Sequence, residues 1–459
     1  MPARATRFHP LLPPRHLLAC ILACTLCLAC LPGTAFGEQR MTDIVVGKTA
    51  QTRGIAAAEL PDIGAPHAIV VGSDGTAYFE RDADAPVKIA SITKVMTAIV
   101  ALEHSQLTDT VTVDHAAATV GQSTAGLQEG DTLTMETALR GLLIPSGNDA
   151  AIAIATTVGR TLDPATTDPV ATFVSAMNTK AQELGCTDTL FENPHGLDFD
   201  AWAGTMHATA RDVATMYAYA MKNETFRSIV NSPATDLTVT GADGTTRQVA
   251  QDMHNVLLGQ EGNIGGKTGT TDAAGYCFVS GYSQDTGGEI YTVVLGASST
   301  DQRFADTAAL ARWYYSHVAT VPVANTQETL GGDPVIGRAV LSDWTDRSVA
   351  ATLDDPSQTA QVFSLAGALE QTVALDEVSG SVRAGQSVGN LVYTQDGKQV
   401  VSVPLVAAQS QEAPSPLEWI LVQLDRIVRS VEGKPTTAQE QVFNEAPDPL
   451  EYDTFKAAA

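Results

Sequence analysis

Apolar and polar positions alternate in different ways along this chain, and the changes mark its elements. Residues 68–79 contain two short apolar runs around a Ser-Asp-Gly turn, a pattern that predicts a β-hairpin. From Ser91 to about His104, apolar side chains recur every three or four residues, which predicts an amphipathic helix. Ser91 and Lys94 would then share one face of that helix, one turn apart.

The next 200 residues or so are predicted to be mostly helical, with strands at the end. Helices are expected over 135–143, 150–158, 171–185, 210–221 and 306–318, and paired strands over 278–282 and 289–295. Strands at both ends with helices inserted between them predict a sheet covered by helices, together with an all-helical lobe.

Near residue 325 the pattern changes to short apolar runs separated by Gly, Asp and Pro. Candidate strands lie at 338–341, 349–353, 371–375, 381–383, 389–393 and 400–406. We therefore expect residues 326–408 to form a separate, small β-rich domain, followed by a polar linker that begins at Gln409.

Residues 416–431 predict one helix whose apolar side chains form a single stripe. Because this helix follows a linker and carries Trp419, we favour contact with a membrane surface. The alternative, that the stripe docks on the protein itself or on a second copy, stays open. The helix and its linker span 409–433, and the polar residues 434–459 are expected to be disordered.

Residues 1–37 predict a secretory signal peptide, so the protein would be exported. Three arginines precede an apolar run at 17–31, and a small-x-small cleavage signal follows at 35–37. The alternatives are an uncleaved anchor or lipidation at one of the four cysteines in this segment. Only Cys186 and Cys277 remain after cleavage, so the core rather than disulfides must hold the fold.

The chain has 459 residues and a formal net charge of −25, which narrows the expected partners. Its length accommodates a signal peptide and two domains. Such acidity argues against binding to nucleic acid and against electrostatic attraction to anionic lipid. The reaction is not restricted by this charge, since a site can be locally positive inside an acidic protein.

Three short motifs stand in one order along the chain: Ser91-Ile92-Thr93-Lys94, Ser146-Gly147-Asn148 and Lys267-Thr268-Gly269. Taken singly, each is more commonly a helix cap or a glycine-rich turn. Together they supply a hydroxyl nucleophile, an amine, a second hydroxyl beside an amide, and a cation on a strand with little side-chain bulk. This combination indicates acyl transfer through a serine ester without a catalytic histidine.

Ser91 is the candidate nucleophile and Lys94 the candidate base. A serine hydroxyl is inert at neutral pH until a base takes its proton. Burial and the second cation, Lys267, would lower the pKa of Lys94 and leave it partly neutral. Ser146 would relay a proton to or from the leaving amine. Asn148 would hold the substrate amide or Lys94.

The third motif supplies candidate substrate contacts. Lys267 offers a charge for a carboxylate, and Thr268 offers a hydroxyl. Gly269 lets a substrate backbone approach the strand closely. The N–H of Thr270, together with that of Ser91 at the start of its helix, would bind the oxyanion of the intermediate.

These motifs and their flanking residues resemble the low-molecular-mass penicillin-binding proteins, specifically the serine D-alanyl-D-alanine carboxypeptidases. The matching segments are 89–98, 145–151, 193–197, 266–271 and 274–276, and the resemblance covers roughly residues 45–320. It implies hydrolysis of the terminal D-Ala from a peptidoglycan stem peptide through an acyl-serine, with β-lactams trapping the same serine. No cofactor and no metal are implied.

The resemblance also implies an architecture. Residues 38–325 would form an α/β domain of the β-lactamase/transpeptidase type, with an antiparallel sheet, covering helices and an all-helical lobe. A small all-β domain and a C-terminal amphipathic helix, a possible membrane anchor over 416–431, would follow. The enzyme would work outside the cytoplasm, in the cell wall or at the outer face of the cytoplasmic membrane.

Three further residues are assigned roles only through the resemblance or by elimination. Arg303 would pair with the terminal carboxylate of the substrate, which suits a guanidinium. His254 stands where some relatives place an arginine. His195 is expected to hold the 193–197 turn, since no second His or Cys lies at metal-ligand spacing.

Three alternatives compete with a carboxypeptidase. A serine β-lactamase would share the acyl-serine step, but the middle motif is Ser-Gly-Asn rather than the Ser-Asp-Asn of one major class. A sensor module would keep the fold without turnover. An endopeptidase that cuts cross-links cannot be separated from a carboxypeptidase by sequence, because the two differ in the shape of the cleft.

Overall fold

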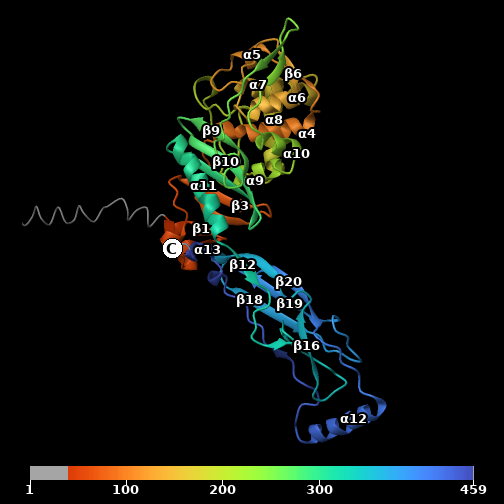
Figure 1. Cartoon of the computed structure of the whole chain (residues 1–459). Coiled ribbons are helices and arrows are strands. Elements are labelled where there is room, and N and C mark those ends of the chain that lie inside the picture. The colour runs from red at the N-terminus through yellow and green to blue at the C-terminus, as the bar shows by residue number, and fades with distance from the viewer. Residues whose placement is uncertain (1–39, 458–459) are drawn as a thin grey trace, which may run out of the picture.

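The computed structural model describes residues 40–457, and the predicted signal peptide lies outside them. The first domain is built around an antiparallel sheet in the order β2-β1-β4-β3-β11-β10-β9 (Figure 1). Its strands are β1 (Ile44–Val45), β2 (Lys48–Thr49), β3 (His67–Gly72), β4 (Ala77–Arg81), β9 (Asn263–Thr271), β10 (Gly275–Gln284) and β11 (Gly288–Ala297). Both predicted strand pairs are confirmed, as β3–β4 and β10–β11.

Alternating side chains bury both faces of this sheet. In β11, Val293 belongs to the core shared with the helical lobe, whereas Val294 belongs to a second core beneath α11 (Thr300–Ser316). On β3, Ile69 likewise packs into the core shared with the helical lobe, and Val70 packs into the core beneath α11. Period-two alternation with both faces apolar therefore makes this a central sheet between two helical layers.

The lobe on the first face contains the helices that carry two of the motifs (Figure 1). They are η2 (Ala90–Thr93), α4 (Lys94–His104), α5 (His115–Thr119), α6 (Met135–Leu143), α7 (Asn148–Leu162), α8 (Pro169–Glu183), α9 (Ala210–Ala220) and α10 (Glu224–Val230), and η3 (Asp200–Trp202) lies in a loop. A small sheet of β5 (Thr110–Thr112), β6 (Thr132–Thr134), β7 (Leu237–Thr240) and β8 (Thr246–Val249) covers its end. The helices predicted in this region are confirmed. The helix predicted from Ser91, however, opens with the 3₁₀ turn η2.

The second domain is all-β with its own core. Its main sheet has the order β18-β19-β20-β16-β15-β21. The strands are β12 (Val318–Pro322), β13 (Thr329–Leu330), β14 (Asp333–Pro334), β15 (Gly337–Val340), β16 (Ser348–Leu353), β17 (Thr359–Phe363), β18 (Leu369–Leu375), β19 (Ser387–Gln395), β20 (Lys398–Ala407) and β21 (Gln441–Val442). The strand predicted at 381–383 is reduced to a single bridge between Val382 and Gln411.

The β12–β17 ribbon joins the two domains. Val318 and Phe363 pack into the core beneath α11, whereas Ala319, Val321 and Val362 pack into the β domain. The second core therefore begins before residue 325, where the sequence pattern put the change. The apolar pattern over 306–318 reads as one helix, although the chain changes from helix to strand within it. Only His317 separates α11 from β12.

Helix α12 (Pro416–Val431) has the predicted bounds and lies at the end of the β domain farthest from the first domain (Figure 1). The Ser415 side chain caps it by accepting the Glu418 N–H, and the Glu418 carboxylate accepts the Ser415 backbone N–H. Val422 is its one buried side chain. The apolar stripe is exposed, and comprises Leu417, Ile420, Leu421, Leu424, Ile427, Val428 and Val431. Within residues 40–457, no helix is both long enough and apolar enough to cross a bilayer.

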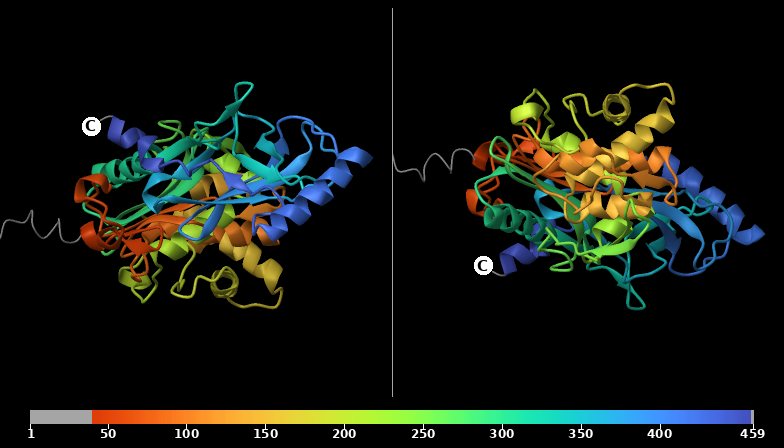
Figure 2. Two further views of the ribbon diagram at one scale, coloured as in Figure 1. Left: turned by 90° about the horizontal axis from the view of Figure 1, so that it is seen from below. Right: turned by 90° about the horizontal axis from the view of Figure 1, so that it is seen from above.

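The expectation that residues 434–459 are disordered is wrong for the part that the structure describes. After α12 the chain runs back along the β domain, where β21 pairs with β15. It continues through η5 (Pro449–Glu451) to α13 (Thr454–Ala457), beside the C-terminal end of α11 (Figures 1 and 2). Polar composition suggested disorder, but Asn444 and Asp453 are buried with hydrogen-bond partners.

Candidate active site

All three motifs meet in one cleft between the sheet edge and the helical lobe. Ser91 comes from η2, Ser146 from the loop between α6 and α7, and Thr268 to Thr270 from β9, the edge strand of the sheet. The cavity has a volume of about 360 Å³. It is lined by Ser91, Ser123, Ser146, Met253, His254, Val256, Thr268, Gly269, Thr270, Thr300, Arg303 and Phe304.

Glycine allows the edge strand to lie directly against the turn that carries Ser91. A β-carbon on Gly269 would lie 2.6 Å from the carbonyl oxygen of Ile89 and 3.1 Å from the backbone nitrogen of Ser91. Any larger residue would therefore push β9 away from η2. Ser91 itself is partly exposed to the cleft.

Lys94 lies directly beneath Ser91 and is fully buried. Its Nζ donates hydrogen bonds to Ser91 Oγ at 2.8 Å, to Asn148 Oδ1 at 2.7 Å and to the carbonyl oxygen of His195 at 2.9 Å. Burial lowers the pKa of Lys94 to about 7, although the Asp149 carboxylate opposes this shift. At neutral pH a substantial fraction of Lys94 is therefore an uncharged amine in contact with the Ser91 hydroxyl.

Lys267 makes an equivalent pair with the second hydroxyl. Its Nζ donates to Ser146 Oγ at 2.7 Å and to the carbonyl oxygen of Thr268 at 2.7 Å. Burial, together with the positive charges of Lys94 and Arg303, lowers the pKa of Lys267 well below its usual value. The cleft thus contains two hydroxyl–amine pairs.

Arg303 joins this cleft from the first turn of α11. Its Nη1 donates to Thr270 Oγ1 at 2.9 Å and to the carbonyl oxygen of Gly269 at 3.3 Å. Among the described residues its Nε has no hydrogen-bond partner. A guanidinium with unused donors at the end of β9 is suited to bind an anion.

Two histidines lie near the site. His195 is buried, and its Nδ1 accepts the Leu197 N–H at 3.1 Å, so it holds the 193–197 turn whose carbonyl contacts Lys94. Burial and the charge of Lys94 lower its pKa to about 3. His254 lines the cleft, and burial and the charges of Lys267 and Arg303 lower its pKa to about 4. Both imidazoles are therefore neutral at pH 7.

Sequence reasoning did not single out Ser123, Asp149 or Phe304. Ser123 and Phe304 line the cleft, and Asp149 lies under the loop at 121–127. The one signal available was the position of Asp149, directly after Ser-Gly-Asn in the first turn of a helix. In the described part, no group of three or more His, Cys, Asp or Glu could hold a metal ion, and the thiols of Cys186 and Cys277 are free and buried.

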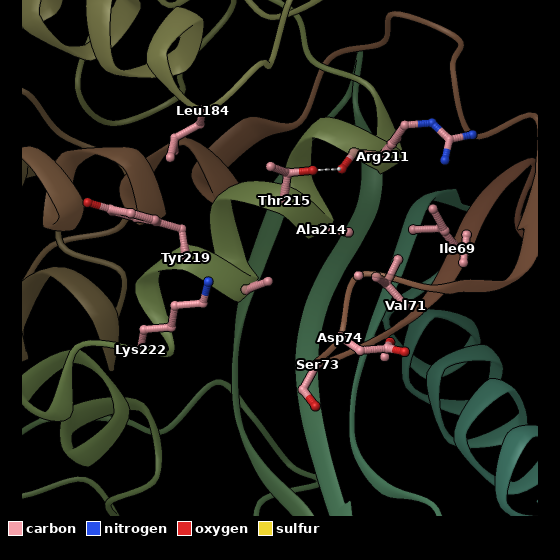
Figure 3. A pocket seen from close by; sticks show the side chains of 14 residues that line it. Ile69, Val71, Ser73, Asp74, Leu184, Arg211, Ala214, Thr215, Tyr219 and Lys222 are labelled. Atoms are coloured by element: carbon pink, nitrogen blue, oxygen red, sulfur yellow. Dashed lines mark hydrogen bonds between the residues drawn. The ribbon is translucent and has the colours of Figure 1, made fainter. Parts of the chain in front are cut away.

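A second hollow, of about 430 Å³, lies between the β3–β4 hairpin and α9 (Figure 3). It contains none of the motif residues. Its Arg211 is paired with Glu80 and Asp84. Its aliphatic side chains, Ile69, Val71 and Leu184, carry no reactive group. The smaller cleft is the candidate active site, because the Ser91 and Ser146 hydroxyls meet the buried amines of Lys94 and Lys267 there.

Comparisons with known proteins agree with this geometry. A family model described as D-alanyl-D-alanine carboxypeptidase matches residues 54–299. The carboxypeptidase DacC of Escherichia coli K12 is 28% identical over 373 residues, covering 77% of this chain and 86% of DacC. A D-alanyl-D-alanine carboxypeptidase of Streptomyces sp. K15 is 33% identical over 251 residues, covering 53% of this chain and 84% of that protein.

Solved structures give the same result. The Streptomyces K15 DD-transpeptidase superposes with a TM-score of 0.51 and 31% identity, covering 55% of this chain and 97% of that one. The carboxypeptidase DacD of Francisella tularensis, at 24% identity and a TM-score of 0.53, covers 77% of this chain and 95% of that one, and shows a shared fold. This chain therefore belongs to the D-alanyl-D-alanine carboxypeptidase family of serine peptidases.

Proposed function

We propose that this carboxypeptidase removes the terminal D-Ala from peptidoglycan stem peptides through an ester on Ser91. The observation that carries the proposal is the 2.8 Å hydrogen bond between Ser91 Oγ and Lys94 Nζ. Because burial lowers the pKa of Lys94 to about 7, the amine can act as a general base near neutral pH.

In the acylation step, neutral Lys94 takes the proton of Ser91 as Oγ attacks the carbonyl carbon of the penultimate D-Ala. The backbone N–H groups of Ser91 and Thr270 are the proposed donors to the oxyanion. The close approach of β9 to η2, which requires glycine at position 269, supports this assignment of the two N–H donors, because Thr270 lies on β9 and Ser91 on η2. An extended substrate would lie along the outer edge of β9, with which no strand of the described chain pairs.

The C–N bond then breaks, and the leaving D-Ala amine takes the proton held by Lys94. Ser146 is the proposed relay, since its hydroxyl contacts Lys267 and lines the cleft. Asn148 keeps Lys94 in place during this transfer. In deacylation, water gives a proton to Lys94 and attacks the ester, and that proton returns to Ser91 Oγ as the ester bond breaks.

The terminal carboxylate of the substrate is assigned to the end of β9. Thr268 and Arg303 offer a hydroxyl and a cation there, and the amine of Lys267, which is buried and has a lowered pKa, reaches the site through its hydrogen bond to Ser146. These groups would select peptides with a free C-terminus over internal peptide bonds. That selection distinguishes a carboxypeptidase from an endopeptidase.

β-Lactams are the second proposed ligand class. Ser91 would open the ring by the same attack, but the leaving amine stays attached to the acyl group and blocks the approach of water. The result would be a lasting adduct on Ser91. No nucleic acid is expected as a partner, because the chain carries a net charge of −25.

The proposed location is outside the cytoplasm, where peptidoglycan is found. Residues 416–431 would contact a membrane surface through the exposed stripe of α12. The charges on this helix cancel, so binding would depend on apolar area rather than on attraction to anionic lipid.

The test compares two substrates for the exported form. One is a stem peptide ending in free D-Ala-D-Ala, and the other is a cross-linked dimer without such an end. We expect D-Ala to be released from the first and the dimer to stay intact. Cleavage of the dimer without release of D-Ala would contradict the proposal and indicate an endopeptidase.

A further inference from the structure

A short loop over the active site is held by one buried carboxylate. Asp149 accepts the backbone N–H of Ala125 at 2.8 Å and that of Leu127 at 3.0 Å, and it also accepts the hydroxyl of Thr124. Only 2% of Asp149 is exposed. Residues 121–127, here called the cleft loop, have no regular secondary structure, so these bonds fix their backbone.

The cleft loop in turn holds Asn148. The Asn148 backbone N–H donates to the carbonyl oxygen of Ser123 at 2.9 Å, and its Nδ2 donates to the carbonyl oxygen of Gly121 at 3.0 Å. With the amide nitrogen engaged by the loop, Oδ1 faces Lys94 Nζ at 2.7 Å. Asp149 is thus connected to Lys94 by a chain of contacts through the loop and Asn148.

Asp149 also acts on Lys94 through its charge. Its carboxylate raises the pKa of Lys94 against the larger effect of burial. The other titratable groups that interact with Lys94 come from three further segments: His195 on the 193–197 turn, Lys267 on β9 and His254 before it. None of these is an anion, so Asp149 is the one carboxylate acting on Lys94 in the described part of the chain.

We propose that Asp149 is a positioning residue for the acylation of Ser91, which fixes the cleft loop and thereby keeps Asn148 and Lys94 in place. This inference rests on the function proposed above. Asp149 would touch neither substrate nor Ser91 and would act through the groups that do. The loop also contributes Ser123 to the cleft, so its displacement would alter the wall facing the substrate.

The first test is the rate of acylation by benzylpenicillin in the Asp149→Asn variant, measured across about pH 5 to pH 10. The amide keeps the shape of the carboxylate but loses its charge and one acceptor. We expect the rate to fall on the order of 10- to 100-fold. The acid limb of the profile should also move to lower pH, because removing a carboxylate that raises the pKa of Lys94 lets that pKa fall.

Asp212→Asn is the matched control. Asp212 is also a buried carboxylate in the first turn of a helix, α9, and it accepts the Thr189 hydroxyl at 2.8 Å and the Asp188 N–H at 3.2 Å. Neither partner lines the cleft. This variant should keep the acid limb where the wild type has it.

Two further variants separate positioning from folding. Asp149→Glu restores the charge and should return the acid limb toward that of the wild type. Thr124→Val removes the bond to Asp149, and the acceptor of the Gly126 N–H, at an exposed loop position, so it should slow acylation several-fold without moving the acid limb.

An Asp149→Asn pH profile that coincides with that of the wild type would overturn the inference. If Asp149→Asn does not fold, a wild-type acylation rate in Thr124→Val would overturn it instead. A wild type that forms no adduct would overturn the proposed function, and this inference with it. A wild type that acylates beside unchanged variants would overturn this inference alone.

Discussion

At the scale of single residues, the proposed chemistry depends on two lysines, Lys94 and Lys267, that are buried away from water. A lysine in water is almost entirely protonated at pH 7 and cannot accept a proton. Lys94 is fully buried, and burial lowers its pKa to about 7. The protonated amine can donate to Ser91, Asn148 and the carbonyl of His195, whereas the neutral amine can keep its two N–H donors on Asn148 and His195 and accept the proton of the Ser91 hydroxyl.

The release of D-Ala should therefore follow the deprotonation of Lys94. Since the neutral amine is the active form and its pKa is about 7, kcat/KM should rise with pH through that region and fall below it. Lys94→Arg should abolish the reaction, because a guanidinium stays protonated. The measurement is initial rates of D-Ala release against pH, and a rate independent of pH between about 5 and 8 would argue against Lys94 as the base.

Arg303→Ala tests the carboxylate site. For a stem peptide with a free C-terminus, kcat/KM should fall. The fall should correspond to a loss of about 1.5–3 kcal/mol in transition-state stabilisation, as expected for a hydrogen bond to a charged group. For the same peptide amidated at its C-terminus, the loss should be much smaller. Arg312→Ala is the control, because Arg312 lies on the same helix but pairs with exposed Glu261. Equal losses for the free and amidated peptides would count against the assignment.

The sequence was sufficient to find the candidate reactive residues, and Asn148 and His195 beside them, but not the carboxylate of Asp149 that holds the neighbouring loop. Ser91, Lys94, Ser146 and Lys267 stand in motifs, and their side chains meet in the structure. Asp149 accepts backbone N–H groups 24 and 22 residues away, and no local sequence pattern predicts such bonds. The position of Arg303 in the cleft likewise depends on how α11 crosses the sheet.

At the scale of elements, periodicity predicted the long helices and the hairpin strands of the β domain, but it missed strands that pair over long distances in sequence. The helices at 135–143 and 416–431 have the predicted bounds, because each is a regular amphipathic segment with a clear cap. Helix α11 begins at Thr300 rather than 306, since the Ser299 side chain caps it by accepting the Gln302 N–H. The strands β12, β17 and β21 were missed because they pair with strands distant in sequence rather than with a hairpin neighbour.

Helix α12 gives a prediction at this scale. Changing both Ile420 and Leu424 to Glu should abolish binding to phospholipid vesicles, because the two side chains lie on the exposed apolar stripe. Release of D-Ala from a soluble peptide should be unchanged, as α12 is remote from the cleft (Figure 1). Gln423→Glu, outside the stripe, is the control, and cosedimentation measures binding. Undiminished binding by the double variant would contradict membrane contact through this stripe.

At the scale of the whole molecule, the chain after α12 connects both domains. Asp453 Oδ2 lies 2.8 Å from Nδ1 of His317, which directly follows α11. The same carboxylate accepts the hydroxyl of Ser364. Asn444 donates to the hydroxyl of Tyr393 and pairs with Gln371 inside the β domain. A sequence pattern can show that residues 434–457 are polar, but it cannot show that Asn444 and Asp453 form buried hydrogen bonds with residues distant in sequence.

Removing residues 434–459 should destabilise the junction without stopping catalysis on small substrates. His317 and Ser364 would lose their buried partner, which costs about 1–3 kcal/mol. The point variant Asp453→Ala should lower the unfolding midpoint in calorimetry, whereas Asp448→Ala, at an exposed cap, should not. Equal midpoints for wild type and Asp453→Ala would show that this contact does not hold the domains.

Acylation of Ser91 is tested by intact-mass spectrometry of the exported form after incubation with benzylpenicillin, and separately with a tripeptide ending in D-Ala-D-Ala. We expect a lasting adduct that maps to Ser91, together with release of D-Ala from the tripeptide. Ser91→Ala should give neither. Rapid loss of penicillin without a lasting adduct, or an adduct on any residue other than Ser91, would show that the enzyme does not work as a carboxypeptidase through Ser91.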